Sequence, residues 1–218
     1  MPFRFTRAHF SPRRTFNRWI VLLFTMLKIP EEFEMEIARL FAHMDAAYDS
    51  AAKKAGFLCN GCKDNCCRTR FYHHTLVELL YFQSGLAAVP LLQQQRIRDR
   101  ARDAARRMEA LEDDRRPVRV MCPLNEQERC MLYAHRPMIC RLHGIPNVLR
   151  RPDGRSLTGP GCDDYYLQCG PTGGDPLDRT PLYTAMADLE RRLRARLGIT
   201  SKIKLTVAQM ILKDSVTL

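Results

Sequence analysis

The sequence lacks the short motifs by which several large enzyme classes are recognised. It contains no G-x-G-x-x-G, no P-loop, no G-x-S-x-G and no H-E-x-x-H. It also lacks the C-x3-C-x2-C triad typical of radical S-adenosylmethionine enzymes, and no independent S-adenosylmethionine site is evident. These absences argue against a dinucleotide-dependent enzyme, a P-loop NTPase, a serine hydrolase and a zinc protease.

Long hydrophobic runs are absent as well. The most apolar stretch, Trp19–Leu27, is far short of the ~20 residues that a membrane-spanning helix needs. There is no internal repeat and no A-x-A cleavage site. With 218 residues, 45% hydrophobic and 27% charged, the chain has the composition of a soluble globular protein that can bury a core without disulfides.

The net charge of +11 is concentrated at the N-terminus. Residues 1–30 hold six basic residues and no acidic one, which leaves 29 basic and 24 acidic residues in the remainder. We expect residues 1–28 to be a disordered tail or a misassigned start. The alternative is an interfacial anchor in which arginines meet anionic lipid and Trp19 inserts. Nucleic acid is not an expected partner, because the body is only mildly basic.

The periodicity of apolar residues predicts a mainly α fold with short β-strands, in which helices surround a small, loop-rich, metal-binding cysteine centre. Residues 29–218 are expected to form this single cysteine-cluster domain, with helices at its C-terminal end. Capping residues and glycines place the expected helices at 31–55, 75–85, 91–114, 180–197 and 206 onward. Strands are expected at 68–74 and 118–121, and a loop at 144–175.

Cysteine is the unusual feature of the composition. The chain has nine, four of them in the stretch "CNGCKDNCC" at 59–67. An odd number cannot pair completely, and adjacent cysteines suit ordinary disulfides poorly, so we expect thiolate ligands in a reducing, cytoplasmic compartment. The alternative is a secreted disulfide protein.

The spacing of the cysteines is typical of metal ligands. In C-x-x-C, Cys59 and Cys62 can direct two thiolates to one centre, in zinc sites, iron–sulfur sites or redox enzymes. The side chains of Cys66 and Cys67 should diverge, so they are expected to serve two metals or two corners of a multinuclear cluster. Eight cysteines would make two four-thiolate sites, with the ninth spare. A thiolate could be replaced by His73, His74 or His143.

Charged neighbours can be interpreted in two ways. Five arginines lie near the cysteines in the sequence: Arg68, Arg70, Arg129, Arg136 and Arg141. They could screen the negative charge of a thiolate centre, or they could be solvated surface residues. Asp163, Asp164 and the tyrosines after them are expected to be loop and packing residues rather than a substrate wall. The arginines of the 91–114 helix are interpreted as a solvated face rather than a phosphate site.

The second group of cysteines lies in "MCPLNEQERCMLYAHRPMICRLHG" at 121–144. Together with "CNGCKDNCC" it resembles the CxxCxxCC cysteine-cluster family, described as a zinc- or iron-chelating domain and related to the cysteine domain of flagellin lysine N-methylase. The matching elements are Cys122-Pro123, Cys130, Leu132-Tyr133, Arg136-Pro137 and Cys140-Arg141. The resemblance covers roughly residues 55–165. This chain departs from the pattern by having three residues between Cys62 and the cysteine pair.

The resemblance implies a set of eight metal ligands, with Cys162 preferred to Cys169 for the last: Cys59, Cys62, Cys66, Cys67, Cys122, Cys130, Cys140 and Cys162. The expected function is chelation of zinc or an iron–sulfur cluster, for example 4Fe-4S. By analogy the centre would support redox chemistry or methyl transfer to a protein substrate or partner. The alternative is a non-catalytic zinc module that stabilises a surface for protein interaction.

Overall fold

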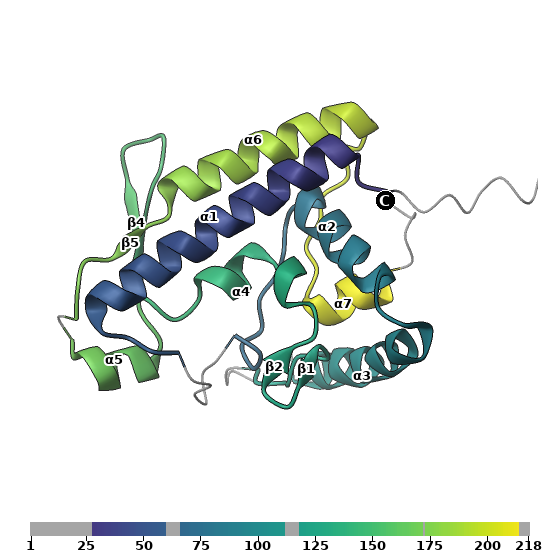
Figure 1. Cartoon of the computed structure of the whole chain (residues 1–218), viewed down its shortest axis with the longest axis horizontal. Coiled ribbons are helices and arrows are strands. Elements are labelled where there is room, and N and C mark those ends of the chain that lie inside the picture. The colour runs from purple at the N-terminus through teal and green to yellow at the C-terminus, as the bar shows by residue number, and fades with distance from the viewer. Residues whose placement is uncertain (1–27, 60–65, 112–117, 172, 214–218) are drawn as a thin grey trace, which may run out of the picture.

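The computed structural model describes residues 28–59, 66–111, 118–171 and 173–213 (Figure 1). The expected tail at 1–28 lies outside these residues except for Lys28. The fold is mainly α with short strands, as the sequence predicts. In the described part of the chain, no helix is both long enough and apolar enough to cross a membrane.

Two long helices lie side by side and carry much of the core (Figure 1). Helix α1 (Glu31–Ala55) buries Phe33, Ile37, Phe41 and Met44, and it ends at Gly56, whose φ of 72° is readily adopted by glycine. Helix α6 (Thr180–Leu197) buries Leu182, Met186, Leu189 and Leu193 and ends at Gly198 in the same way. The apolar faces of these two amphipathic helices pack against each other.

Three further helices extend the core formed by α1 and α6. Helices α2 (Leu76–Ala87) and α7 (Val207–Leu212) begin at the predicted threonine caps, and α7 has the full capping box between Thr206 and Gln209. Helix α3 (Leu91–Ala110) packs along α7. Residues 112–114 of its predicted range lie outside the described residues.

The second cysteine segment is short and irregular. A two-stranded hairpin, β1 (Asn125–Glu126) and β2 (Arg129–Cys130), turns through Gln127 and Glu128, both with positive φ. A 3₁₀ turn, η1 (Tyr133–His135), leads to α4 (Met138–Leu142), which starts after Pro137 as predicted. Helix α4 packs against α1, so the segment is attached to the longest helix.

Three predictions of local structure are wrong. The predicted loop at 144–175 contains the antiparallel strands β3 (Asn147–Arg150) and β4 (Ser156–Gly159) and helix α5 (Asp163–Cys169); β5 (Leu177–Asp178) then pairs with β3. The predicted strands at 68–74 and 118–121 are instead extended segments with isolated bridges, Thr69 to Arg119 and His73 to Leu205. Each bridge is a single pair of residues, so neither segment forms a continuous ladder of strand hydrogen bonds.

Candidate metal centre

Seven of the eight predicted ligands line one cavity of about 1330 Å³. They come from four separate parts of the chain: Cys59, Cys66, Cys67, Cys122, Cys130, Cys140 and Cys162. Cys62 lies outside the described residues. Cys169 is not among the described residues that line the cavity, which agrees with the preference for Cys162. The fold therefore gathers thiols separated by up to 103 positions in the sequence.

Backbone hydrogen bonds hold the first three thiols together. The N–H of Cys122 donates to the carbonyl of Cys67 at 2.7 Å, which joins the two cysteine segments. The N–H of Asn125 then donates to the carbonyl of Cys122 at 3.0 Å, and Asn125 pairs with Cys130 across the β1–β2 hairpin. The hairpin thus brings the Cys130 side chain close to that of Cys122.

The sulfur atoms themselves already accept hydrogen bonds. The Cys122 thiol accepts from the backbone N–H groups of Leu124 and Asn125, and the Cys130 thiol from that of Leu132. The side chain of Asn125 also bonds to Cys67. Donors aimed at sulfur stabilise the thiolate form, which is the form that binds metal. They are one of the interactions that tune metal–thiolate centres.

Helix α4 brings Cys140 into the same group. Its first residue, Met138, donates its backbone N–H to Glu78 Oε1 at 3.0 Å, and Glu78 Oε2 accepts the hydroxyl of Thr75 at 2.7 Å. Glu78 therefore reaches back to the hydroxyl of its N-cap residue, and its other oxygen fixes the start of α4. The Cys140 thiol interacts electrostatically with Cys67, Cys122 and Cys130.

The remaining cysteines gather at the other side of the cavity, around Tyr48. The tyrosine interacts electrostatically with Cys59, Cys66 and Cys162. Cys162 belongs to a separate small apolar cluster with Phe57. Its sulfur lies beside Gly144, where a methyl group in place of the glycine hydrogen would be 3.7 Å from it. Near Cys59, the side-chain amide of Gln168 both donates to and accepts from the backbone of Leu58, each at 3.0 Å.

Cys66 connects the two groups. Its thiol shares a hydrogen bond with the thiol of Cys67, so the adjacent side chains do not diverge as expected. This bond raises the pKa of Cys66 and lowers that of Cys67 to about 6. Cys66 also interacts electrostatically with Cys140.

All five arginines that could screen a thiolate centre line the cavity. Asp45 of α1 holds two of them, with its oxygens 3.0 Å from Arg136 and 2.5 Å from Arg141. Arg141 also donates to the carbonyl of Arg136 at 3.0 Å and lies over the ring of Phe41. The charge of Arg136 acts on Cys66, Cys67 and Cys130. Two cations sharing one carboxylate leave a positive surplus beside the thiols.

Most of the thiols resist ionisation in the absence of a cation. Burial raises the pKa of Cys122 to about 12, with a further rise from the neighbouring Cys67 and Cys130 and a partial offset from the donors to its sulfur. Burial and neighbouring thiols likewise raise the pKa of Cys130 and Cys140. A bound metal would supply the positive charge that this cluster lacks, and protons would leave as it binds.

The donor set fits a thiophilic metal, because it combines thiols, hydrogen-bond donors to sulfur and adjacent guanidinium groups. As the side chains stand, the described residues contain no group of three or more His, Cys, Asp or Glu placed to hold a metal ion. No disulfide joins two of the eight cysteines in the described ranges.

Histidine stays a secondary candidate. His73 is 2% exposed and lines the cavity, with Nδ1 3.7 Å from Glu78 Oε1. His143 also lines the cavity, with its ring against Phe71. His74 is exposed and is not among the described lining residues. Burial beside a carboxylate makes His73 a core residue in this structure.

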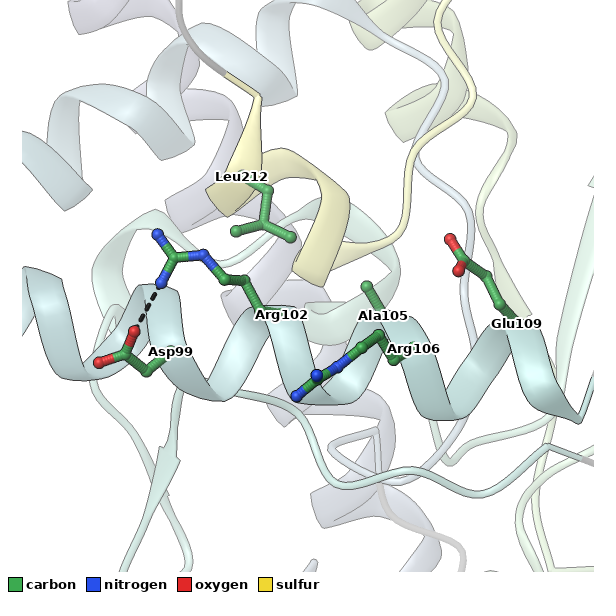
Figure 2. A pocket seen from close by; sticks show the side chains of 6 residues that line it. All are labelled: Asp99, Arg102, Ala105, Arg106, Glu109 and Leu212. Carbon is green, nitrogen blue, oxygen red and sulfur yellow. Dashed lines mark hydrogen bonds and ion pairs between the residues drawn. The ribbon is translucent and has the colours of Figure 1, made fainter.

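A second, smaller hollow of about 470 Å³ lies between α3 and α7 (Figure 2). Its two arginines are matched by acidic side chains, since Arg102 contacts Asp99 at 2.5 Å and Arg106 lies 3.7 Å from Asp103. The predicted Asp103–Arg107 pair is also present, at 3.8 Å. This balance of charge agrees with a solvated helix face.

The residues around Cys162 agree with the packing interpretation. Tyr165 is buried against Phe57, whereas Asp163 is exposed in the first turn of α5.

Comparisons of the chain with models of protein families, with curated proteins and with solved structures find no match. The resemblance to the cysteine-cluster family therefore stays a prediction that rests on the motifs.

Proposed function

We propose that this protein binds a thiophilic metal, zinc or an iron–sulfur cluster, through its cysteine centre. The observation that carries the proposal is the convergence of seven cysteines from four parts of the chain on one cavity. Thiols crowded in this way repel each other when ionised, so their gathering is best explained by a cation that they share. Backbone donors to Cys122 and Cys130 and the arginine pair at Asp45 support the same conclusion.

The family resemblance adds that such a centre would support redox chemistry or methyl transfer to a protein lysine. A non-catalytic zinc module is the alternative function. The cysteines suit a reducing, cytoplasmic compartment.

The test is purification without oxygen, followed by elemental analysis and absorption spectroscopy. An iron–sulfur protein will be brown, with iron and acid-labile sulfide in similar amounts and broad absorbance near ~400 nm. A zinc protein will be colourless, with stoichiometric zinc that is released when a thiol reagent is added. Protein that is folded by circular dichroism but contains neither metal, and takes up neither on reconstitution, would disprove the function.

A further inference from the structure

The described thiols divide into two groups rather than one. Among Cys67, Cys122, Cys130 and Cys140, every pair interacts electrostatically. Cys59, Cys66 and Cys162 form the other group, which meets at Tyr48. Cys66 also contacts the first group through Cys67 and Cys140, but it is not among the groups that act most strongly on Cys122 or Cys130. The same division appears in the packing: Cys122 and Cys130 pack on the main hydrophobic core, while Cys162 belongs to the separate cluster with Phe57 and Tyr165.

From this division we propose that Cys67, Cys122, Cys130 and Cys140 form one complete four-thiolate metal site that does not need Cys59, Cys66 or Cys162. The proposal rests on the proposed function and specifies which cysteines share a metal. Four thiolates satisfy either a tetrahedral zinc ion or one four-iron cluster.

Three structural elements support this particular set. The 2.7 Å bond from Cys122 N–H to the Cys67 carbonyl fixes these two cysteines relative to each other. The hairpin fixes Cys130 to Asn125, which also donates to Cys67 and Cys122. Glu78 anchors the N-terminal end of α4, which carries Cys140.

Hydrogen bonds to sulfur involve three members of this set. Donors from backbone or side-chain amides reach the thiols of Cys67, Cys122 and Cys130. Such donors lower the cost of holding several thiolates together in a partly buried site.

The adjacent pair Cys66 and Cys67 provides the sharpest test. Metal-depleted protein is titrated with Co²⁺, whose visible bands report how many thiolates bind it, and zinc competition then gives the affinity. We expect Cys67→Ser to weaken the tightest site by more than about tenfold and to change its bands, because one ligand is lost. Cys66→Ser should leave the bands and the affinity of that site within about twofold, and Cys169→Ser serves as the control.

A combined variant tests whether the set is complete. With Cys59→Ser, Cys66→Ser and Cys162→Ala together, the chain should still bind one Co²⁺ or zinc with four-thiolate bands, or about four iron after anaerobic reconstitution. Adding Cys130→Ser should then abolish binding. If the combined variant does not fold, the Cys66 and Cys67 single variants decide the question.

The outcomes separate the two proposals. If wild-type protein binds metal but Cys66→Ser weakens the tightest site as much as Cys67→Ser does, the division into groups is wrong while the function stands. Loss of all metal from a folded combined variant has the same meaning. If folded wild-type protein binds neither cobalt, zinc nor iron, the proposed function itself fails.

Discussion

Cys122 donates its backbone N–H to the carbonyl of Cys67 at 2.7 Å, across 55 positions of sequence. This bond joins the segment that follows the cysteine-rich stretch to the segment that precedes the β1–β2 hairpin. It fixes the backbone between two thiols, so the distance between their sulfurs depends mainly on side-chain rotation.

Cys140→Ser should remove metal from the centre and lower the yield of soluble protein. Cys140 is carried by a helix of five residues, held to Glu78 and α1, and metal binding is coupled to folding in small thiolate sites. The measurements are metal content by elemental analysis and the midpoint of urea unfolding. Cys169→Ser is the matched control, because this thiol is not among the described lining residues. Unchanged metal content in Cys140→Ser would remove Cys140 from the ligands.

Asp45→Asn should destabilise the protein by about 1–3 kcal/mol, since hydrogen bonds to charged groups contribute at this level. The substitution leaves Arg136 and Arg141 close together, with the Arg141 side chain only 3% exposed, and without their shared carboxylate. Urea unfolding at neutral pH gives the change in free energy. Asp49→Asn, an exposed position one turn further along α1, removes the same charge and should cost less than about 0.5 kcal/mol. Equal losses in the two variants would contradict a specific role for Asp45.

The helices and the cysteine set could be predicted from the sequence because their signals are local. Apolar residues at helical spacing and terminal glycines indicated α1 and α6, and threonine caps indicated the starts of α2 and α7. Cysteine spacing pointed to the thiols that line the cavity. The strands β3 and β4 gave no such signal. They are four residues each and surrounded by proline, glycine and aspartate, so their composition matches a loop. β4 is largely exposed and β3 is half-buried, so neither shows a clear apolar face.

The residues that support the centre could not be predicted, because their partners are distant in sequence. Asp45 lies 91 positions from Arg136, Gln168 lies 110 from Leu58, and Glu78 lies 60 from Met138. In the sequence, nothing distinguishes Asp45 from the other polar residues of its helix, and the pattern around Glu78 indicates only a capping box. Only the packing of α1, α2 and α4 shows that their carboxylates face the cysteine segment.

The stability of the protein should fall in acid partly through Glu78. Burial alone would raise the pKa of this carboxyl, but the nearby charge of His73 and the hydrogen bonds from Thr75 and Met138 outweigh burial and lower it. A carboxyl with a lowered pKa in the folded state stabilises the protein above its unfolded value of about 4.3, and this contribution is lost as the pH falls through the folded value.

Glu78→Gln should therefore destabilise the protein at pH 7 and flatten the decline of stability below about pH 4. Urea unfolding of metal-depleted wild type and variant across pH 3–7 checks this, because the difference between them cancels the titration of the thiols. Glu109→Gln on the exposed face of α3 is the control and should leave the curve unchanged. A Glu78→Gln curve parallel to wild type would show that the carboxyl does not titrate differently on folding.

Gln168→Ala should loosen the segment that leads to Cys59. The Gln168 amide makes two 3.0 Å hydrogen bonds to the backbone of Leu58, and a third bond, at 2.7 Å to Asp164, holds the amide in place. Because these bonds are exposed, their loss should cost only about 1 kcal/mol in overall stability. The local effect should match it. Hydrogen exchange of the Leu58 amide, whose N–H donates to Gln168, should speed up by about fivefold in metal-depleted protein, since opening is favoured by about 1 kcal/mol. Gln95→Ala, which removes an exposed amide on α3, should leave the exchange rate of the Leu58 amide unchanged. If the Leu58 amide exchanges at the wild-type rate in both variants, Gln168 does not hold the segment before Cys59 in solution.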